Sequence, residues 1–196
     1  MSSHYIIRDD QEPALFIKEG EAISEKAMFS LLEWNPLVII DESLIGMVLH
    51  HKINVDAVVI QELEEADVVD LLEIQSPFDI LKRSNLPQDL LEYLTMKGMH
   101  ALDIVAPFDS DIIEFAEEVE KVFPVNIFSG NKKYVRCQNH FEKWATAGRG
   151  FLLYPYVESI QVQNLVPQKE GAFAVEKEGK ISIQSPEPIW VGEVLF

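Results

Sequence analysis

The hydrophobic residues of the first 130 positions fall into short apolar runs that alternate with amphipathic segments. The runs have the length of buried strands, and the segments between them repeat apolar residues at the spacing of a helix. We expect strands at residues 14–17, 37–41, 57–60, 78–81, 101–106 and 125–128. We expect helices at residues 24–34, 42–52, 87–98 and 109–122. This alternation predicts a Rossmann-like α/β domain, whose parallel sheet is covered on both faces.

The pattern changes after Gly130, where short and partly alternating apolar runs are separated by glycine, proline and asparagine. We expect strands there at residues 132–137, 141–144, 150–154, 159–164, 172–176, 180–184 and 189–195. Such a series is typical of an antiparallel β-sandwich. We therefore predict two domains, an α/β domain at residues 1–130 and a smaller β-sandwich domain at residues 131–196.

Two features refine the predicted helices. Ser24 can act as an N-cap, and Pro87 stands where proline opens a helix. Asp109 and Asp111 lie in the first turn of the last predicted helix, where the helix dipole favours acids. The acidic segment 62–73 shows no clear period, so the sequence leaves its structure open.

Composition places the chain among ordinary globular proteins, since 47% of its 196 residues are hydrophobic and 25% are charged. No apolar stretch approaches the roughly 18 residues of a membrane span, so we expect no membrane association. The opening MSSHYIIRDDQEP has no basic segment followed by an apolar one, so we expect no secretory signal. Cys137 is the only cysteine, which excludes an internal disulfide. We expect a soluble, cytoplasmic protein.

The net charge of −17 is distributed unevenly. Residues 1–130 carry 8 basic and 26 acidic side chains, whereas residues 131–196 carry 8 and 7. A surface this acidic repels phosphate backbones, so we expect no nucleic-acid partner. The same charge opposes the binding of a bare nucleotide to the first domain.

Candidate chemistry is confined to the carboxyl ends of the predicted strands, where open parallel sheets bind their ligands. Asp41, Glu62 and Glu64 follow two of these strands and are of the type that binds divalent cations. Acids are abundant throughout this half, however, and no spacing is diagnostic. We therefore favour a solvated rim over a metal site. No glycine-rich phosphate loop, histidine ligand spacing or nucleophile elbow is present, so we assign no catalytic residue.

Four stretches together resemble the thiamin pyrophosphokinase family: QEPALFI, LLEWNPLVIID, HKINVDAVVI and FEKWATAGRGFLLYPYVESIQVQNL. The resemblance extends from about Ser3 to the end of the chain. It implies an ATP-type domain followed by a thiamin-type domain, and a homodimer. It also implies transfer of pyrophosphate from ATP to the hydroxyl of thiamin, with release of AMP and with magnesium as the metal.

The chemical motifs of that family are largely missing. Its Gly-Asp-x-Asp-Ser motif falls on residues 60–64, where both aspartates are absent and Glu62 lies between their positions. Its Asp-Gly pair becomes Asp41 followed by Glu42. Its Asp-Lys-x-Asp motif falls on residues 83–86, without the lysine or the second aspartate.

Two further motifs are lost. The glycines, arginine and histidine of the family's Gly-Gly-Arg-x-Asp-His stretch are missing from residues 107–111. The Ser-Asn pair that holds thiamin in the family has no counterpart between Gly171 and Ser185.

We therefore expect a thiamin pyrophosphokinase-like protein whose activity is lost or much reduced, with Asp41 and Glu62 as the remaining substrate-binding positions. One alternative is an active enzyme that uses magnesium and ATP through Asp41, Glu62 and Glu64. Another is a sensor that binds thiamin or a related heterocycle, with Trp144 or Trp190 near the ligand.

Overall fold

The computed structural model describes residues 12–75 and 77–195, so residues 1–11 of the opening segment assessed for a secretory signal lie outside these ranges. The chain divides into two compact units, Met1–Gly130 and Asn131–Phe196.

The strands of the first unit lie side by side in the order β6-β5-β1-β2-β3-β4. Every neighbouring pair in this order is parallel. All residues of β1, β2, β3 and β5 are buried, as strands covered on both faces must be. The strands are β1 (Ala14–Ile17), β2 (Val38–Asp41), β3 (Ala57–Ile60), β4 (Asp79–Lys82), β5 (Leu102–Val105) and β6 (Val125–Ser129). The predicted parallel sheet is confirmed.

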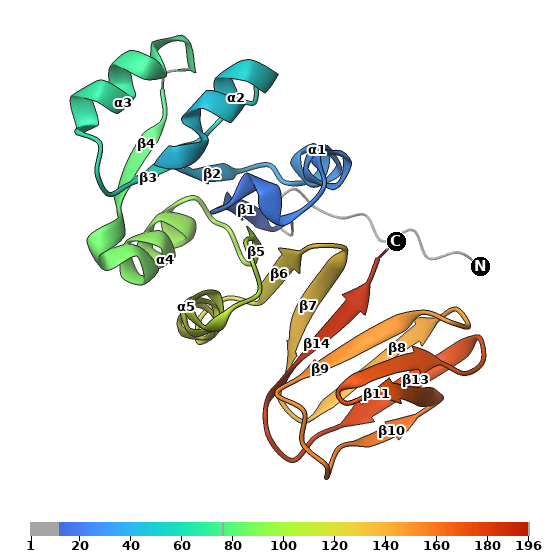
Figure 1. Ribbon diagram of the computed structural model, residues 1–196. Helices are drawn as coiled ribbons and strands as arrows, with labels where there is room; N and C mark the ends of the chain where they lie inside the picture. Colours follow the sequence, from blue (N-terminus) through green and yellow to red (C-terminus); the bar gives the residue numbers. More distant parts are fainter. Residues whose placement is uncertain (1–11, 76, 196) are drawn as a thin grey trace. The chain divides into compact units, whose positions relative to one another are not determined.

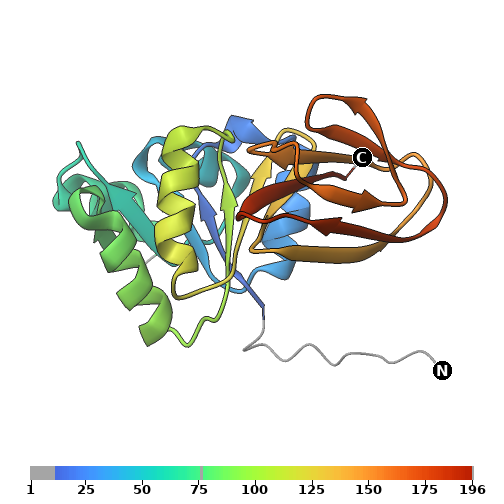
Figure 2. The ribbon, with the colours of Figure 1, turned by 90° about the horizontal axis from the view of Figure 1, so that it is seen from below.

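Helices cover both faces of this sheet. Figure 1 shows α1, α2 and α3 on one face and α4 and α5 on the other, and Figure 2 shows α4 beside α5. This arrangement follows from right-handed crossovers that run one way from β1 to β4 and then return through β5. The helices are α1 (Glu25–Trp34), α2 (Ile45–His51), α3 (Glu65–Leu71), α4 (Leu86–Met96) and α5 (Ser110–Glu120). None of the helices in the described ranges has the length and apolar character needed to cross a membrane.

Ser24 is the N-cap of α1, as predicted, and Asp109, expected in the first turn of its helix, is the N-cap of α5. The Ser24 hydroxyl accepts a hydrogen bond from the Ala27 N–H at 3.3 Å, and Asp109 Oδ1 accepts one from the Ile112 N–H at 3.0 Å. Pro87 lies in the first turn of α4.

Two segments differ from the sequence expectation or extend it. The helix expected at residues 42–52 begins as a 3-10 turn, Glu42–Leu44, before α2. The acidic segment 62–73, left open by its sequence, contains α3. This helix buries Val68 on its inner side and directs its acidic side chains outward.

The second unit consists of antiparallel strands in two sheets, ordered β11-β12-β9-β14-β7 and β10-β13-β8. Alternate residues from both sheets form one apolar core, which includes Phe151, Ile181 and Val191. The strands are β7 (Lys132–Cys137), β8 (His140–Ala145), β9 (Gly150–Tyr154), β10 (Gln161–Gln163), β11 (Leu165–Lys169), β12 (Ala172–Val175), β13 (Gly179–Gln184) and β14 (Ile189–Val194).

One strand of this unit was not predicted. The sequence indicated a single strand at residues 159–164, but the chain forms β10 and β11, which belong to different sheets and meet at Asn164. Asn164 has a φ of 59°, a left-handed conformation that asparagine tolerates better than most residues. Pro167 argues against a strand at this position in the sequence, because proline has no backbone N–H to donate to a neighbouring strand. Among the described strands, β11 pairs only with β12 and lies at an edge of its sheet, where proline is tolerated.

Asn164 also joins the crossing point to a neighbouring loop. Its side-chain amide donates to the Lys177 carbonyl at 2.7 Å and its side-chain oxygen accepts from the Lys177 N–H at 3.0 Å. We expect Asn164→Ala to lower the free energy of unfolding by about 1–3 kcal/mol, because the variant loses these bonds and strains the backbone. Asn164→Gly removes the same bonds without the strain, so its loss should be smaller. Urea unfolding of both variants measures the difference, and equal losses would contradict the role of the left-handed conformation.

Two glycines give a second, paired prediction about packing. A Cβ on Gly192 would lie 2.5 Å from Tyr134 Cε1, whereas a Cβ on Gly46 in α2 would meet nothing within 4 Å. We expect Gly192→Ala to destabilise the protein by about 1–3 kcal/mol through overpacking against a buried ring. Gly46→Ala should stabilise it by about 0.5–1 kcal/mol, because alanine favours a helix interior. Thermal melts of both variants check the two signs.

Candidate functional site

The carboxyl ends of β1 to β4 meet at one edge of the parallel sheet and form two open depressions. Such edges are the usual ligand sites of open α/β sheets. The smaller depression, of about 410 Å³, is lined by Lys18, Glu19, Asp41, Glu42, Ser43, Gln61, Glu62 and Arg83. The larger, of about 600 Å³, is lined by residues 60–65 and 82–84. The two predicted substrate-binding positions, Asp41 and Glu62, are therefore brought to the same depression.

Asp41 ends β2 and is buried, and both of its carboxylate oxygens already have partners within the chain. Oδ1 accepts hydrogen bonds from the Ser43 N–H at 3.1 Å and from the Ser43 hydroxyl at 2.8 Å. Oδ2 accepts one from the Arg83 guanidinium at 3.2 Å. The carboxylate thus caps the 3-10 turn that follows β2 and pairs with a cation from the end of β4.

Glu42, the next residue, reaches across to the loop that follows β3. Its Oε1 accepts from the Glu62 N–H at 2.9 Å, and its Oε2 accepts from the N–H groups of Gln61 and Leu63, both at 3.1 Å. Burial raises the pKa of this carboxyl. The three backbone donors and the Arg83 charge lower it by more, so the pKa lies below its usual value of 4.5. Glu42 therefore acts as an anion held by backbone N–H groups.

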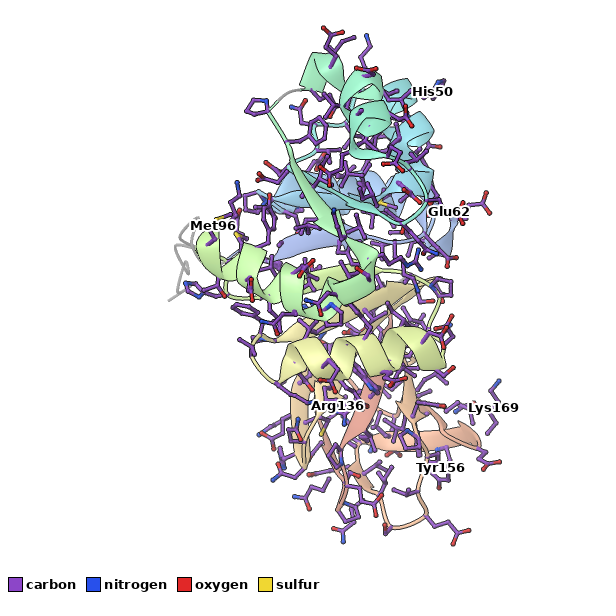
Figure 3. All side chains as sticks on the ribbon, turned by 90° about the vertical axis from the view of Figure 1, so that its left-hand side faces the viewer. His50, Glu62, Met96, Arg136, Tyr156 and Lys169 are labelled. Atoms are coloured by element: carbon purple, nitrogen blue, oxygen red, sulfur yellow. The ribbon has the colours of Figure 1, made fainter. Side chains whose placement is uncertain are left out.

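The described acidic side chains of this edge are not gathered into a cluster of metal ligands. Glu62 contributes its backbone N–H to Glu42, while its own side chain is exposed at the surface (Figure 3). Within residues 12–75 and 77–195, no group of three or more His, Cys, Asp or Glu side chains is placed to hold a metal ion. With the oxygens of Asp41 engaged, the arrangement of Asp41, Glu62 and Glu64 does not fit the cation.

Two basic side chains of the edge, Lys82 and Arg83, are also paired with acids. Lys82 lies 3.0 Å from Glu65, whose hydrogen bond and charge raise the lysine pKa, and Arg83 pairs with Asp41. Acids outnumber bases around both depressions. A triphosphate at this edge would therefore meet net repulsion.

The second unit carries the tryptophans considered for a heterocyclic ligand. Trp144 on β8 is 68% exposed, whereas Trp190 on β14 is 1% exposed and lies against Arg136, with 5.5 Å between the guanidinium and the ring centre. Trp144 is accessible to a ligand and Trp190 is not. A polar depression of about 430 Å³ in this unit is lined by Asn139, His140, Ser159, Gln161, Gln184, Ser185 and Pro186.

The sequence analysis identified Asp41 and Glu62 but assigned no role to Glu42, which accepts three hydrogen bonds at the edge. The sequence did contain one indication of this role. Glu42 immediately follows the buried strand β2, and β2 lies beside β3 in the parallel sheet. Sequence alone did not show that a side chain from one strand end would reach the backbone of the next.

The Glu42 contacts predict a pH-dependent contribution to stability. A carboxyl with a lowered pKa stabilises the folded state above its unfolded pKa, and the effect is lost as the pH falls through the folded pKa. We expect Glu42→Gln to lower the free energy of unfolding at pH 7 by about 1 kcal/mol, because solvent screens these bonds. The difference from the unmodified protein should shrink below pH 4.5.

Thermal melts between pH 7 and pH 3 measure this difference. Glu62→Gln is the matched control, since it removes a charge from the same loop without removing an acceptor for these N–H groups. An equal loss in the control would contradict the assignment to the Glu42 contacts.

Comparisons with known proteins extend these observations. No family profile and no curated protein sequence matches the chain. Among solved structures, the fold is similar to thiamin pyrophosphokinase from Candida albicans, with a TM-score of 0.69 and 9% identity over 95% of this chain and 90% of that one. Thiamine pyrophosphokinase from Bacillus subtilis gives a TM-score of 0.61 and 9% identity over 92% and 98% of the two chains.

A protein from Lactobacillus plantarum gives a TM-score of 0.65 and 5% identity, covering 93% of this chain and 98% of that one. The resemblance seen in the sequence is confirmed in three dimensions, although identity to these structures is only 5–9%. The chain has the fold of the thiamin pyrophosphokinases.

Proposed function

We propose that this chain is a thiamin pyrophosphokinase-like protein in which the transfer of pyrophosphate from ATP to thiamin is lost or much reduced. One contact pattern supports this above all others. This strand edge corresponds to the position of the family's metal and phosphate motifs. There, the carboxylate oxygens of Asp41 and Glu42 accept hydrogen bonds from donors of the same chain.

The energetics of phosphoryl transfer support the same reading. Such reactions depend on positioning and on charge stabilisation more than on covalent help from the protein. Removal of one preorganised stabilising group typically costs about 10²–10³ in rate. At least four motif positions differ here, and even strongly non-additive effects leave very little activity.

Partners and ligands belong to the same proposal. We take the protein to be a cytoplasmic homodimer, as the family resemblance implies. If turnover is retained, it requires magnesium and ATP. A thiamin-type heterocycle bound without reaction is the second candidate, and exposed Trp144 favours it because a flat ring can stack on such a side chain.

A ligand-dependent thermal melt tests these functions together. A ligand at 100 times its dissociation constant adds about 2.7 kcal/mol, which a chain of this size shows as a shift of several degrees. We expect no shift with magnesium-ATP and no formation of thiamin pyrophosphate from thiamin and ATP. Sedimentation of the same sample should give twice the mass of one chain.

Each other outcome selects a different function. A shift with thiamin alone, together with quenching of tryptophan fluorescence that Trp144→Phe abolishes, would establish the sensor. Clear turnover would overturn the proposal. In that case Asp41→Ala combined with Glu62→Gln should remove the metal-dependent rate if these residues are substituted ligands.

A further inference from the structure

Helices α1 and α2 border a groove on one face of the parallel sheet (Figure 1). Its volume is about 400 Å³. Small-molecule sites have volumes of about 300–1,000 Å³, so the groove is of that size. Its described lining residues belong to the first unit, and the groove shares none of them with the two depressions at the carboxyl edge. This second space, here called the α1–α2 groove, is therefore distinct from the strand-end site.

Most of the lining of the α1–α2 groove is apolar. Three of its apolar side chains, Ile23, Met28 and Ile53, are buried, whereas Phe29 is 36% exposed. Methionine side chains adapt their shape to a ligand, and their sulfur atoms make favourable contacts with aromatic rings. The groove therefore suits a small aromatic body. The apolar lining residues are Ile23, Met28, Phe29, Leu44, Met47 and Ile53.

The remaining charge at the groove is acidic. Glu21 and Glu25 line it and are exposed. His51 Nδ1 lies 3.8 Å from Glu25 Oε1, which is longer than a hydrogen bond. None of the described lining residues is lysine or arginine. Because the first unit as a whole is also strongly acidic, electrostatics at this groove favour a cation and oppose an anion.

We propose that the α1–α2 groove binds a small organic cation, in which an aromatic body carries a protonated amine. The body packs on the apolar side chains, and the ammonium group donates hydrogen bonds to the carboxylates of Glu21 and Glu25. Such bonds between charged groups are stronger than those between neutral ones. The inference stands on the lining of the groove and does not require the proposed function.

Two simpler explanations make different predictions. If the groove is only an apolar cleft, it binds an aromatic ring with equal affinity whether the attached group is charged or neutral. If the net charge of the protein is sufficient, removal of any acid of the same helix weakens binding of an amine equally. Glu33 lies on α1 with Glu25 but does not line the groove, so Glu33→Gln separates position from charge.

The experiment titrates three compounds with the same ring into the isotope-labelled full chain at pH 7 and constant ionic strength. They are phenylethylamine as cation, phenylethanol as neutral analogue and phenylpropanoate as anion. Shifts of backbone amide signals in nuclear magnetic resonance give both the affinity and the location. We expect shifts within residues 20–53 and an affinity for the amine at least about tenfold above that for the alcohol. The anion should bind more weakly than the alcohol.

Two pairs of variants locate the interactions. Glu25→Gln should weaken binding of the amine at least about threefold and leave the alcohol unaffected, whereas Glu33→Gln should change neither. A Cβ on Gly20 would lie 3.0 Å from Met47 Sδ, whereas one on Gly46 would meet nothing within 4 Å. Gly20→Leu should therefore fill the groove and abolish binding of both compounds, and Gly46→Leu should retain it. Circular dichroism checks the fold of each variant, and the glutamate pair remains decisive if Gly20→Leu does not fold.

Three results would overturn the proposal. The first is an affinity for phenylethanol equal to that for phenylethylamine, which would leave an unselective apolar cleft. The second is an equal loss in Glu33→Gln and Glu25→Gln, which would make net charge the cause. The third is absence of amine binding to the unmodified chain, or binding that shifts amide signals only outside residues 20–53.

Discussion

Register between short parallel strands is the constraint on which the rest of the first unit depends. Each of the strands β1 to β5 is four residues long, and neighbouring strands lie about 4.8 Å apart. Asp41 pairs with Val59 and Ile60 pairs with Lys82. The residues that leave these strands are therefore brought together by backbone hydrogen bonding, whatever their side chains are. The site is a consequence of the sheet, and its chemistry depends on which residues occupy the strand ends.

Those strand ends are occupied by groups that satisfy one another. Asp41 accepts from Ser43 and Arg83, Lys82 pairs with Glu65, and Glu42 accepts from the backbone of the next loop. A sheet edge that binds a ligand has some hydrogen-bond donors and acceptors that are not paired within the chain. Here the first unit has an open parallel sheet, and polar groups at its carboxyl edge join the strand ends to each other.

The sequence predicted regular elements well where period and caps agreed. Ser24, Asp109 and Pro87 mark helix starts by local chemistry, and the buried strands of the first unit are apolar except for Asp41 and Asp103. Prediction failed at β11, because Pro167 argues against a central strand and nothing local shows that a strand lies at an edge. It also missed Glu42, whose role depends on a contact across 20 positions of the sequence.

The unequal burial of the three tryptophans determines what spectroscopy sees of this protein. Trp34 and Trp144 are 65% and 68% exposed, so their emission is already that of indole in water, whereas Trp190 is 1% exposed. Unfolding changes the surroundings of Trp190 far more than those of the other two. Trp190 belongs to the second unit, and Trp34 is the sole tryptophan of the first. Tryptophan fluorescence followed during denaturation therefore reports mainly on unfolding of the second unit. Unfolding of the first unit changes the fluorescence little and is followed instead by the circular dichroism of its helices.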